Sequence, residues 1–120
     1  MAFPTINYKA TSVEMDPNWQ MLIEQKFTSF ERYVGEETDT RCSVEFEKVA
    51  AQQSGDVHRV EVNLWLSGTM YRAEATADSF EKAIDEVRDQ LDKELRRAHK
   101  KQNTLMRRGG RMLKRMLNRD

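Results

Sequence analysis

The alternation of apolar and polar positions predicts four strands. The cleanest alternation begins at His58, where apolar residues fill every second position and polar residues lie between them: Val60, Val62, Leu64 and Leu66. Ser67-Gly68 predicts a tight turn after this strand, so residues 70–77 should return as its antiparallel partner. Shorter alternating stretches predict two further strands, at residues 5–9 and 42–49.

Two other segments carry apolar residues at helical spacing. Asp16-Pro17 predicts the start of the first helix, with Asp16 as N-cap, and Gly35 predicts its end. Its apolar face comprises Trp19, Leu22, Ile23, Phe27, Phe30 and Val34. Asp78-Ser79 predicts the start of the second helix. The apolar face of this second helix comprises Phe80, Ile84, Val87, Leu91, Leu95 and Ala98.

This order of elements, β-α-β-β-β-α, predicts an α+β fold of two layers. A four-stranded sheet would carry both helices on one face and leave the other face to solvent or to a partner. The length of 120 residues suits one domain with a modest core. We expect that domain at residues 1–102 and a basic, flexible tail at residues 103–120.

Charge changes sign along the chain. Residues 1–95 carry 10 Lys/Arg and 19 Asp/Glu, a net charge of −9, whereas residues 96–120 carry 10 Lys/Arg and only Asp120, a net charge of +9. An acidic body with a basic end favours a polyanion as partner, because clustered cations release condensed counterions from phosphates.

The basic residues of the second helix form a ridge opposite its apolar face. With Ile84 at zero and 100° per residue, Lys93, Arg96, Arg97 and Lys100 fall at roughly 180°, 120°, 220° and 160°. The same side is acidic earlier in the helix, through Asp85, Glu86 and Asp89. Cations near a helix C-terminus also complement the helix dipole, so the ridge alone fits either a solubilising helix end or a polyanion site. Its continuation into a basic tail favours the polyanion site.

The tail is expected to be a separate unit. Gly109-Gly110 predicts a break, after which apolar and basic positions form a short amphipathic turn that is too short to be helical alone. An RNA groove, an anionic membrane surface or a partner protein could each order it. Its cations are Arg107, Arg108, Arg111, Lys114, Arg115 and Arg119.

No pattern of residues indicates an enzyme, a metal site or a cofactor. His58 and His99 have no Cys or carboxylate at metal-ligand spacing. Cys42 is the single cysteine, typical of a packing residue in a reducing cytosol. Trp65 lies on the face opposite Val62, where it could stack on a base or pack against Arg59, Tyr71 or Arg72; packing is the commoner arrangement. We also expect no membrane span and no small-molecule substrate.

The second helix carries a specific motif, Asp78-Ser79-Phe80-Glu81-Lys82-Ala83-Ile84-Asp85, followed by Leu91-Asp92-Lys93-Glu94-Leu95-Arg96-Arg97 and Lys100-Lys101. The first helix adds Lys26-Phe27-x-x-Phe30-Glu31-Arg32-Tyr33. Through these motifs the chain resembles the ribosome hibernation factors, which include the short hibernation-promoting factor and the ribosome-associated translation inhibitor. The resemblance covers about residues 6–101. The basic tail differs from the acidic tail of the translation-inhibitor branch.

The resemblance implies a fold similar to double-stranded-RNA-binding domains. It also implies a cytoplasmic, non-enzymatic protein that binds the small ribosomal subunit and its rRNA at the decoding region, over the messenger and transfer RNA sites. The RNA-binding positions carried over are Lys93, Arg96, Arg97, Lys100 and Lys101, with Lys26 and Arg32 as weaker ones. The tail would extend the RNA contact or reach a ribosomal protein. The alternative is a regulatory protein-interaction module that acts on a transcription factor.

Overall fold

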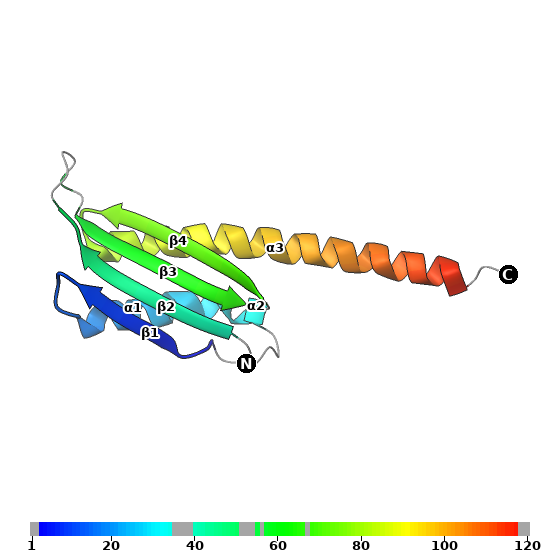
Figure 1. The fold of residues 1–120 in the computed structure, drawn as a ribbon, viewed down its shortest axis with the longest axis horizontal. Coiled ribbons are helices and arrows are strands. Elements are labelled where there is room, and N and C mark those ends of the chain that lie inside the picture. The colour runs from blue at the N-terminus through cyan, green and yellow to red at the C-terminus, as the bar shows by residue number, and fades with distance from the viewer. Residues whose placement is uncertain (1–2, 35–39, 51–54, 56, 67, 118–120) are drawn as a thin grey trace.

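The computed structural model describes residues 3–34, 40–50, 55, 57–66 and 68–117, with side chains as far as residue 101. Its elements are β1 (Ile6–Thr11), α1 (Pro17–Phe27), the 3-10 turn η1 (Thr28–Phe30), α2 (Glu31–Val34), β2 (Thr40–Lys48), β3 (His58–Leu66), β4 (Thr69–Ala77) and α3 (Phe80–Leu117). The strands lie in the order β1-β2-β3-β4, with β1 parallel to β2 and the other pairs antiparallel. Figure 1 shows the helices behind one face of the sheet. The predicted α+β, β-α-β-β-β-α fold is therefore confirmed.

The core lies between this sheet and the helices. The alternation in β3 gives the expected burial, because its four apolar residues from Val60 to Leu66 are buried while the residues between them are half-buried on the open face. α1 and η1 contribute Ile23, Phe27 and Phe30, and all three side chains are fully buried. Burying side chains of this kind contributes roughly 1.5–3 kcal/mol each.

The first helical segment begins as predicted but is not one continuous helix. Asp16 is the N-cap, and its carboxylate accepts a hydrogen bond from the backbone N–H of Asn18 at 2.9 Å. η1 then interrupts the segment, and α2 ends at Val34. The Thr28 and Ser29 hydroxyls donate to backbone carbonyls one turn earlier, which accompanies the tighter 3-10 geometry. Gly35, the predicted end, lies outside the described residues.

The sheet extends beyond the predicted strand bounds at several ends. β1 continues to Thr11 because the parallel ladder pairs it with β2 as far as Glu47. The Thr11 hydroxyl also donates to the Glu45 carboxylate at 2.6 Å. At the β3–β4 hairpin, Gly68 has φ +80, a conformation in which a side chain would be strained, so the predicted turn depends on this glycine.

α3 begins as predicted and ends much later than predicted. The Ser79 hydroxyl accepts a hydrogen bond from the backbone N–H of Lys82 at 3.2 Å and so caps the helix. The helix then runs to Leu117, so the predicted break at Gly109-Gly110 is wrong. The glycines cost about 1 kcal/mol each in a helix, but a segment that continues an existing helix needs no nucleus of its own. The division into residues 1–102 and a flexible tail stays a prediction.

Candidate nucleic-acid interface

The basic ridge is an exposed strip of α3. α3 covers the sheet with Ile84, Val87, Leu91 and Leu95, all buried. The side chains that face away from this contact are exposed, as the helical arithmetic predicted. We define the basic ridge as Lys93, Arg96, Arg97, Lys100 and Lys101. Within the described residues, α3 therefore presents five exposed cations, with Glu94 exposed among them, where its contact with the sheet ends.

Asp92 lies beneath this ridge and contacts two of the predicted RNA-binding arginines. It is only 8% exposed. The Arg96 Nε lies 3.1 Å from its Oδ2, and the Arg32 Nη2 lies 3.7 Å from its Oδ1. One carboxylate thus holds an arginine of α2 and an arginine of α3 side by side. The structure places Arg32 next to the ridge, although it lies 60 positions before Asp92 in the sequence.

Ring contacts strengthen the packing of α2 against α3 at this point. The guanidinium of Arg32 lies 4.8 Å from the centre of the Tyr33 ring. Tyr33 in turn meets the His99 ring edge-on, with the ring centres 5.6 Å apart. His99 therefore packs against α2 from the margin of the ridge. The sequence reasoning missed both Asp92 and Tyr33 as supports of the ridge, although the spacing of Asp92 and Arg96 is a recognisable helical pair.

Lys26 does not join the ridge. Its ammonium group pairs with Asp85, in the acidic first half of α3. Asp85 precedes Lys93 by eight residues, which is about 12 Å along a helix. The structure therefore separates Lys26 from Arg32, although both lie on the first helical segment.

The tail is placed only through its backbone. Residues 107–117 continue α3, so they extend the same helix beyond the sheet (Figure 1). The side chains of Arg107, Arg108, Arg111, Lys114 and Arg115 lie outside those the structure describes. Their part in RNA binding stays a prediction.

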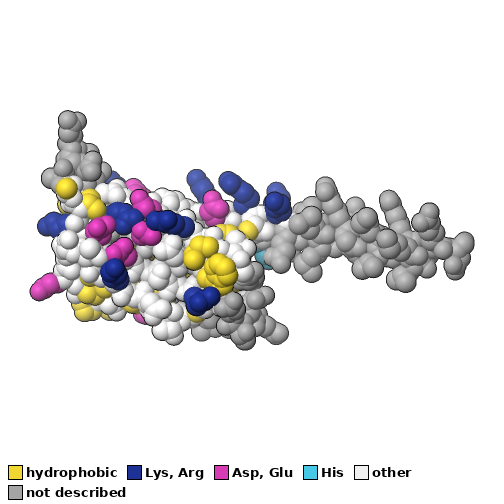
Figure 2. All heavy atoms as spheres, in the orientation of Figure 1, with side chains coloured by type: hydrophobic (Ala, Val, Ile, Leu, Met, Phe, Trp, Pro, Cys, Tyr) yellow, Lys and Arg dark blue, Asp and Glu magenta, His cyan; other side chains and the backbone are white. Residues whose placement is uncertain are grey.

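The centre of the open sheet face is a network of ion pairs and not a cationic surface. Arg59 is 16% exposed at its side chain and contacts the carboxylates of Glu47 at 3.1 Å, Glu74 at 2.7 Å and also Glu61. Arg72 contacts Glu61 at 3.0 Å from the neighbouring strand. Figure 2 shows positive and negative side chains interspersed on this face. Hydrogen bonding from Arg59 holds the pKa of the Glu61 carboxyl below its ordinary value.

Trp65 lies at one end of the same face. It is half-buried, and the guanidinium of Arg41 lies 5.8 Å from its ring centre. Its other cross-strand neighbour is Met70. Packing across strands is therefore present, and it includes Arg41, which the sequence did not suggest as a partner.

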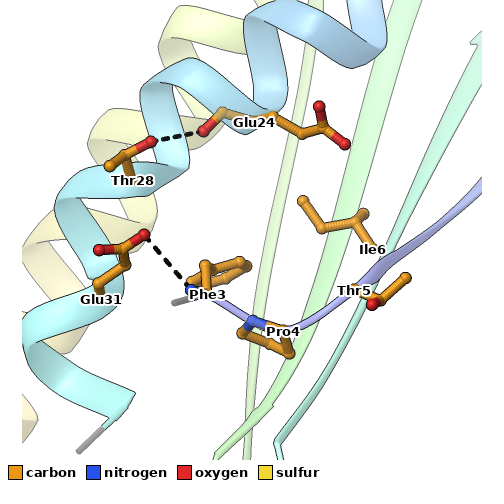
Figure 3. A pocket seen from close by; sticks show the side chains of 7 residues that line it. All are labelled: Phe3, Pro4, Thr5, Ile6, Glu24, Thr28 and Glu31. Carbon is orange, nitrogen blue, oxygen red and sulfur yellow. Dashed lines mark hydrogen bonds between the residues drawn. The ribbon is translucent and has the colours of Figure 1, made fainter. Parts of the chain in front are cut away.

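One pocket and one buried cysteine lie apart from the ridge in the described part of the chain. A hollow of about 340 Å³ lies between the start of β1 and α1, lined by Phe3, Pro4, Thr5, Ile6, Glu24, Thr28 and Glu31 (Figure 3). Glu31 accepts a hydrogen bond from the backbone N–H of Phe3 there, at 3.4 Å. Burial raises the pKa of the Cys42 thiol to about 12, so the thiol is protonated at neutral pH. Among the described residues, no group of His, Cys, Asp and Glu could hold a metal ion.

A family model covers most of the chain. It is described as sigma 54 modulation protein / S30EA ribosomal protein, and it matches residues 6–103. The chain belongs to this family, whose members are ribosome-associated proteins. This confirms the family resemblance that the second-helix motif indicated. Among curated proteins, none matches the chain.

Two solved structures show the same fold. One is the N-terminal domain of Protein Y from Thermus thermophilus, with a TM-score of 0.63 and 22% identity over 78% of this chain and 98% of that one. The other is a ribosomal subunit interface protein from Coxiella burnetii, with a TM-score of 0.61 and 20% identity over 78% of this chain and 96% of that one. At these identities the likeness supports the fold. No helix in the described part of the chain is both long and apolar enough to cross a bilayer.

Proposed function

We propose that this protein is a cytoplasmic ribosome hibernation factor. It binds rRNA of the small ribosomal subunit at the decoding region, blocks the messenger and transfer RNA sites, and silences translation under stress or in stationary phase. The observation that carries the proposal is the exposed basic ridge on α3, to which Asp92 adds Arg32 of α2. Family membership supports the ribosome as the polyanion that this ridge binds.

The proposed mechanism is electrostatic and steric. The ridge cations neutralise rRNA phosphates and release their counterions, while the folded body fills the RNA path. Such a surface reads the shape and backbone of RNA and not its base sequence. The tail residues of α3 lie on the same helix and would extend the contact, along RNA or towards a ribosomal protein.

Cosedimentation with purified small ribosomal subunits in rising salt tests this proposal. The informative variant reverses Lys93, Arg97, Lys100 and Lys101 to Glu and keeps Arg96, because Arg96 pairs with the buried Asp92. We expect the variant to lose binding, since it removes four phosphate-neutralising cations from exposed positions. Loss of four phosphate contacts would by itself reduce the steepness of the plot of log K against log salt concentration by roughly 3.

The matched control reverses charge on the same helix, two to three turns earlier. Replacing Asp85, Glu86 and Asp89 by Lys should not weaken binding, and both variants should melt cooperatively. Pelleting of the ridge variant as well as wild type would exclude the ridge as the RNA surface. Absence of the wild-type protein from the pellet at low salt would overturn the proposed function and favour the regulatory module instead.

A further inference from the structure

The ridge and the Trp65 end of the sheet lie at the same end of the molecule. α3 runs antiparallel to β4, and the Gln90 side chain bonds both backbone groups of Glu74, at 3.0 and 3.2 Å. One turn later on α3, Glu94 lies near Tyr71 at the start of β4, and its charge adds to burial in raising the pKa of Tyr71. The ridge begins at this level of the helix. Trp65 and Met70, which face each other across β3 and β4, lie beside the same start of β4.

Acidic residues are concentrated at the opposite end of the open face from Trp65. The glutamates that surround Arg59 lie away from this end, towards the end of β4 that leads into α3. The acidic first half of α3 lies there as well. On the open face, the carboxylates at that end pair with Arg59 and Arg72, so neither arginine is left to a polyanion there. Figure 2 shows hydrophobic side chains gathered at the end of the sheet from which α3 projects, with a cation beside them.

The end with Trp65 has the form of a shallow aromatic site. A hollow of about 410 Å³ is lined by Asn7, Arg41, Cys42, Ser43, Trp65 and Met70. Met70 is 53% exposed, which is unusual for a large apolar side chain in this structure. The Arg41 guanidinium lies over the Trp65 ring, 5.8 Å from its centre, within reach of a cation–π contact.

This combination of groups suits an unpaired nucleobase. Aromatic rings and guanidinium planes both stack on bases that are splayed out of an RNA helix. Asn7 and Ser43 are exposed on the neighbouring strands and could bond to the edge of such a base. The site and the ridge lie at the same end of the molecule but in different layers, so an RNA strand that contacts both would have to pass around the edge of the sheet at β4.

We infer that Trp65, Arg41 and Met70 form a base-stacking site for single-stranded RNA. The site holds an unstacked base of the same RNA whose phosphates lie on the basic ridge, so the inference rests on the proposed function. Duplex RNA occupies the ridge alone, because its bases are paired and stacked. The protein therefore distinguishes single-stranded from duplex RNA at this site.

Tryptophan fluorescence gives a direct test. The chain contains two tryptophans, and the other one, Trp19, is buried against Phe46 and Phe80. Titration with an oligoadenylate of about 12 nucleotides, within the site sizes of strand-binding folds, should quench the emission of Trp65. An RNA duplex should bind without quenching. The Trp65→Phe variant, which keeps only Trp19, should show no quenching with either RNA.

Affinity measurements on two substitutions separate stacking from charge. Trp65→Leu should weaken binding of the oligoadenylate by about 5- to 150-fold, as for loss of one stacked base, and leave the salt slope unchanged because no cation is removed. Met70→Ala should weaken it in the same direction. The matched control is Met21→Ala: Met21 is 65% exposed but lies on α1 in the other layer, so binding should not change.

The outcomes distinguish this site from the proposed function. If Trp65→Leu binds oligoadenylate as wild type does, or if duplex quenches as strongly as the single strand, the base site is wrong. A loss of small-subunit binding without loss of oligoadenylate binding would assign the patch to a ribosomal protein and also overturn it. In each of these cases the ridge variants still decide the proposed function by themselves.

Discussion

Replacing Arg59 by Met should destabilise the protein strongly at neutral pH and hardly at all at low pH. Methionine replaces the aliphatic stem of Arg59, whose side chain is 16% exposed. It removes the charge that is shared by the carboxylates of Glu45, Glu47, Glu61 and Glu74. The glutamate carboxylates would then lie close together and repel one another, because the Arg59 guanidinium would no longer lie between them to neutralise their charge. Arg72 would remain near two of them, Glu61 and Glu74.

The contacts set the size of the effect. Arg59 makes three hydrogen bonds to carboxylates, and a bond to a charged group contributes roughly 1.5–3 kcal/mol when it is buried. Glu47 and Glu74 are partly exposed, so water and salt screen two of the three. We therefore expect a loss of about 2–3 kcal/mol, less than the 3–5 kcal/mol for a fully buried pair that loses one partner. The melting temperature should fall by roughly 10–15 °C.

The assay is urea unfolding of wild type and variant at several pH values. The pKa of the Glu61 carboxyl is lowered in the folded state, so its contribution is present above the ordinary glutamate pKa. That contribution is lost as pH falls through the lowered folded-state pKa. The stability gap between wild type and variant should therefore close in acid, and at pH 7 it should narrow with added salt. The matched control is Arg72→Met, 61% exposed, with a loss of at most about 1 kcal/mol.

A gap that is as large in acid as at pH 7 would refute this reasoning. It would show that the Arg59 stem contributes through packing, because protonated glutamates cannot interact with its charge. An Arg72→Met variant as unstable as Arg59→Met would also contradict it, because the expected difference between the two arginines follows from their difference in exposure.

Three further predictions concern the ends and edges of elements. Ser79→Ala removes the N-cap of α3 and should cost about 1 kcal/mol in urea unfolding; an unchanged free energy would mean that the cap is dispensable. Gln90→Leu uncovers both backbone groups of Glu74 at the sheet edge, so sedimentation should detect self-association that grows with concentration, and a variant that stays monomeric would contradict this. Deleting residues 109–120 should leave the melting temperature unchanged and lower the salt slope of RNA binding by roughly 0.7–0.9 for each phosphate that the tail neutralises, whereas an unchanged slope would exclude the tail from the RNA interface.

The sequence predicts features that depend on neighbouring residues. The alternation of β3 and the caps at Asp16 and Ser79 involve groups within a few positions, and the structure confirms all three. The exposure of the basic ridge follows from helical periodicity alone. The fold class follows in turn, because the order of such elements leaves few ways to bury their apolar faces.

Contacts between residues far apart in the sequence could not be predicted, because they depend on strand register and on how the helices pack. Arg59 contacts several carboxylates only because the register places Glu47 and Glu74 beside it from two other strands. Arg32 reaches the ridge only because α2 packs against α3 near Asp92. Gly109-Gly110 predicts a break because glycine is unfavourable within a helix. The helix nevertheless continues, because the long helix before it is already formed and the segment needs no nucleation step of its own.

The separation of charge along the chain has a consequence for how the protein meets its partner. An acidic body and a basic end make a large permanent dipole, although the net charge is zero. In the field of a polyanion such a dipole experiences a torque, so the molecule turns its basic end forward before any contact forms. Encounters with the acidic end first are repelled and brief. Orientation of this kind raises the association rate in dilute salt, and it weakens at physiological ionic strength, where screening acts over about 8 Å.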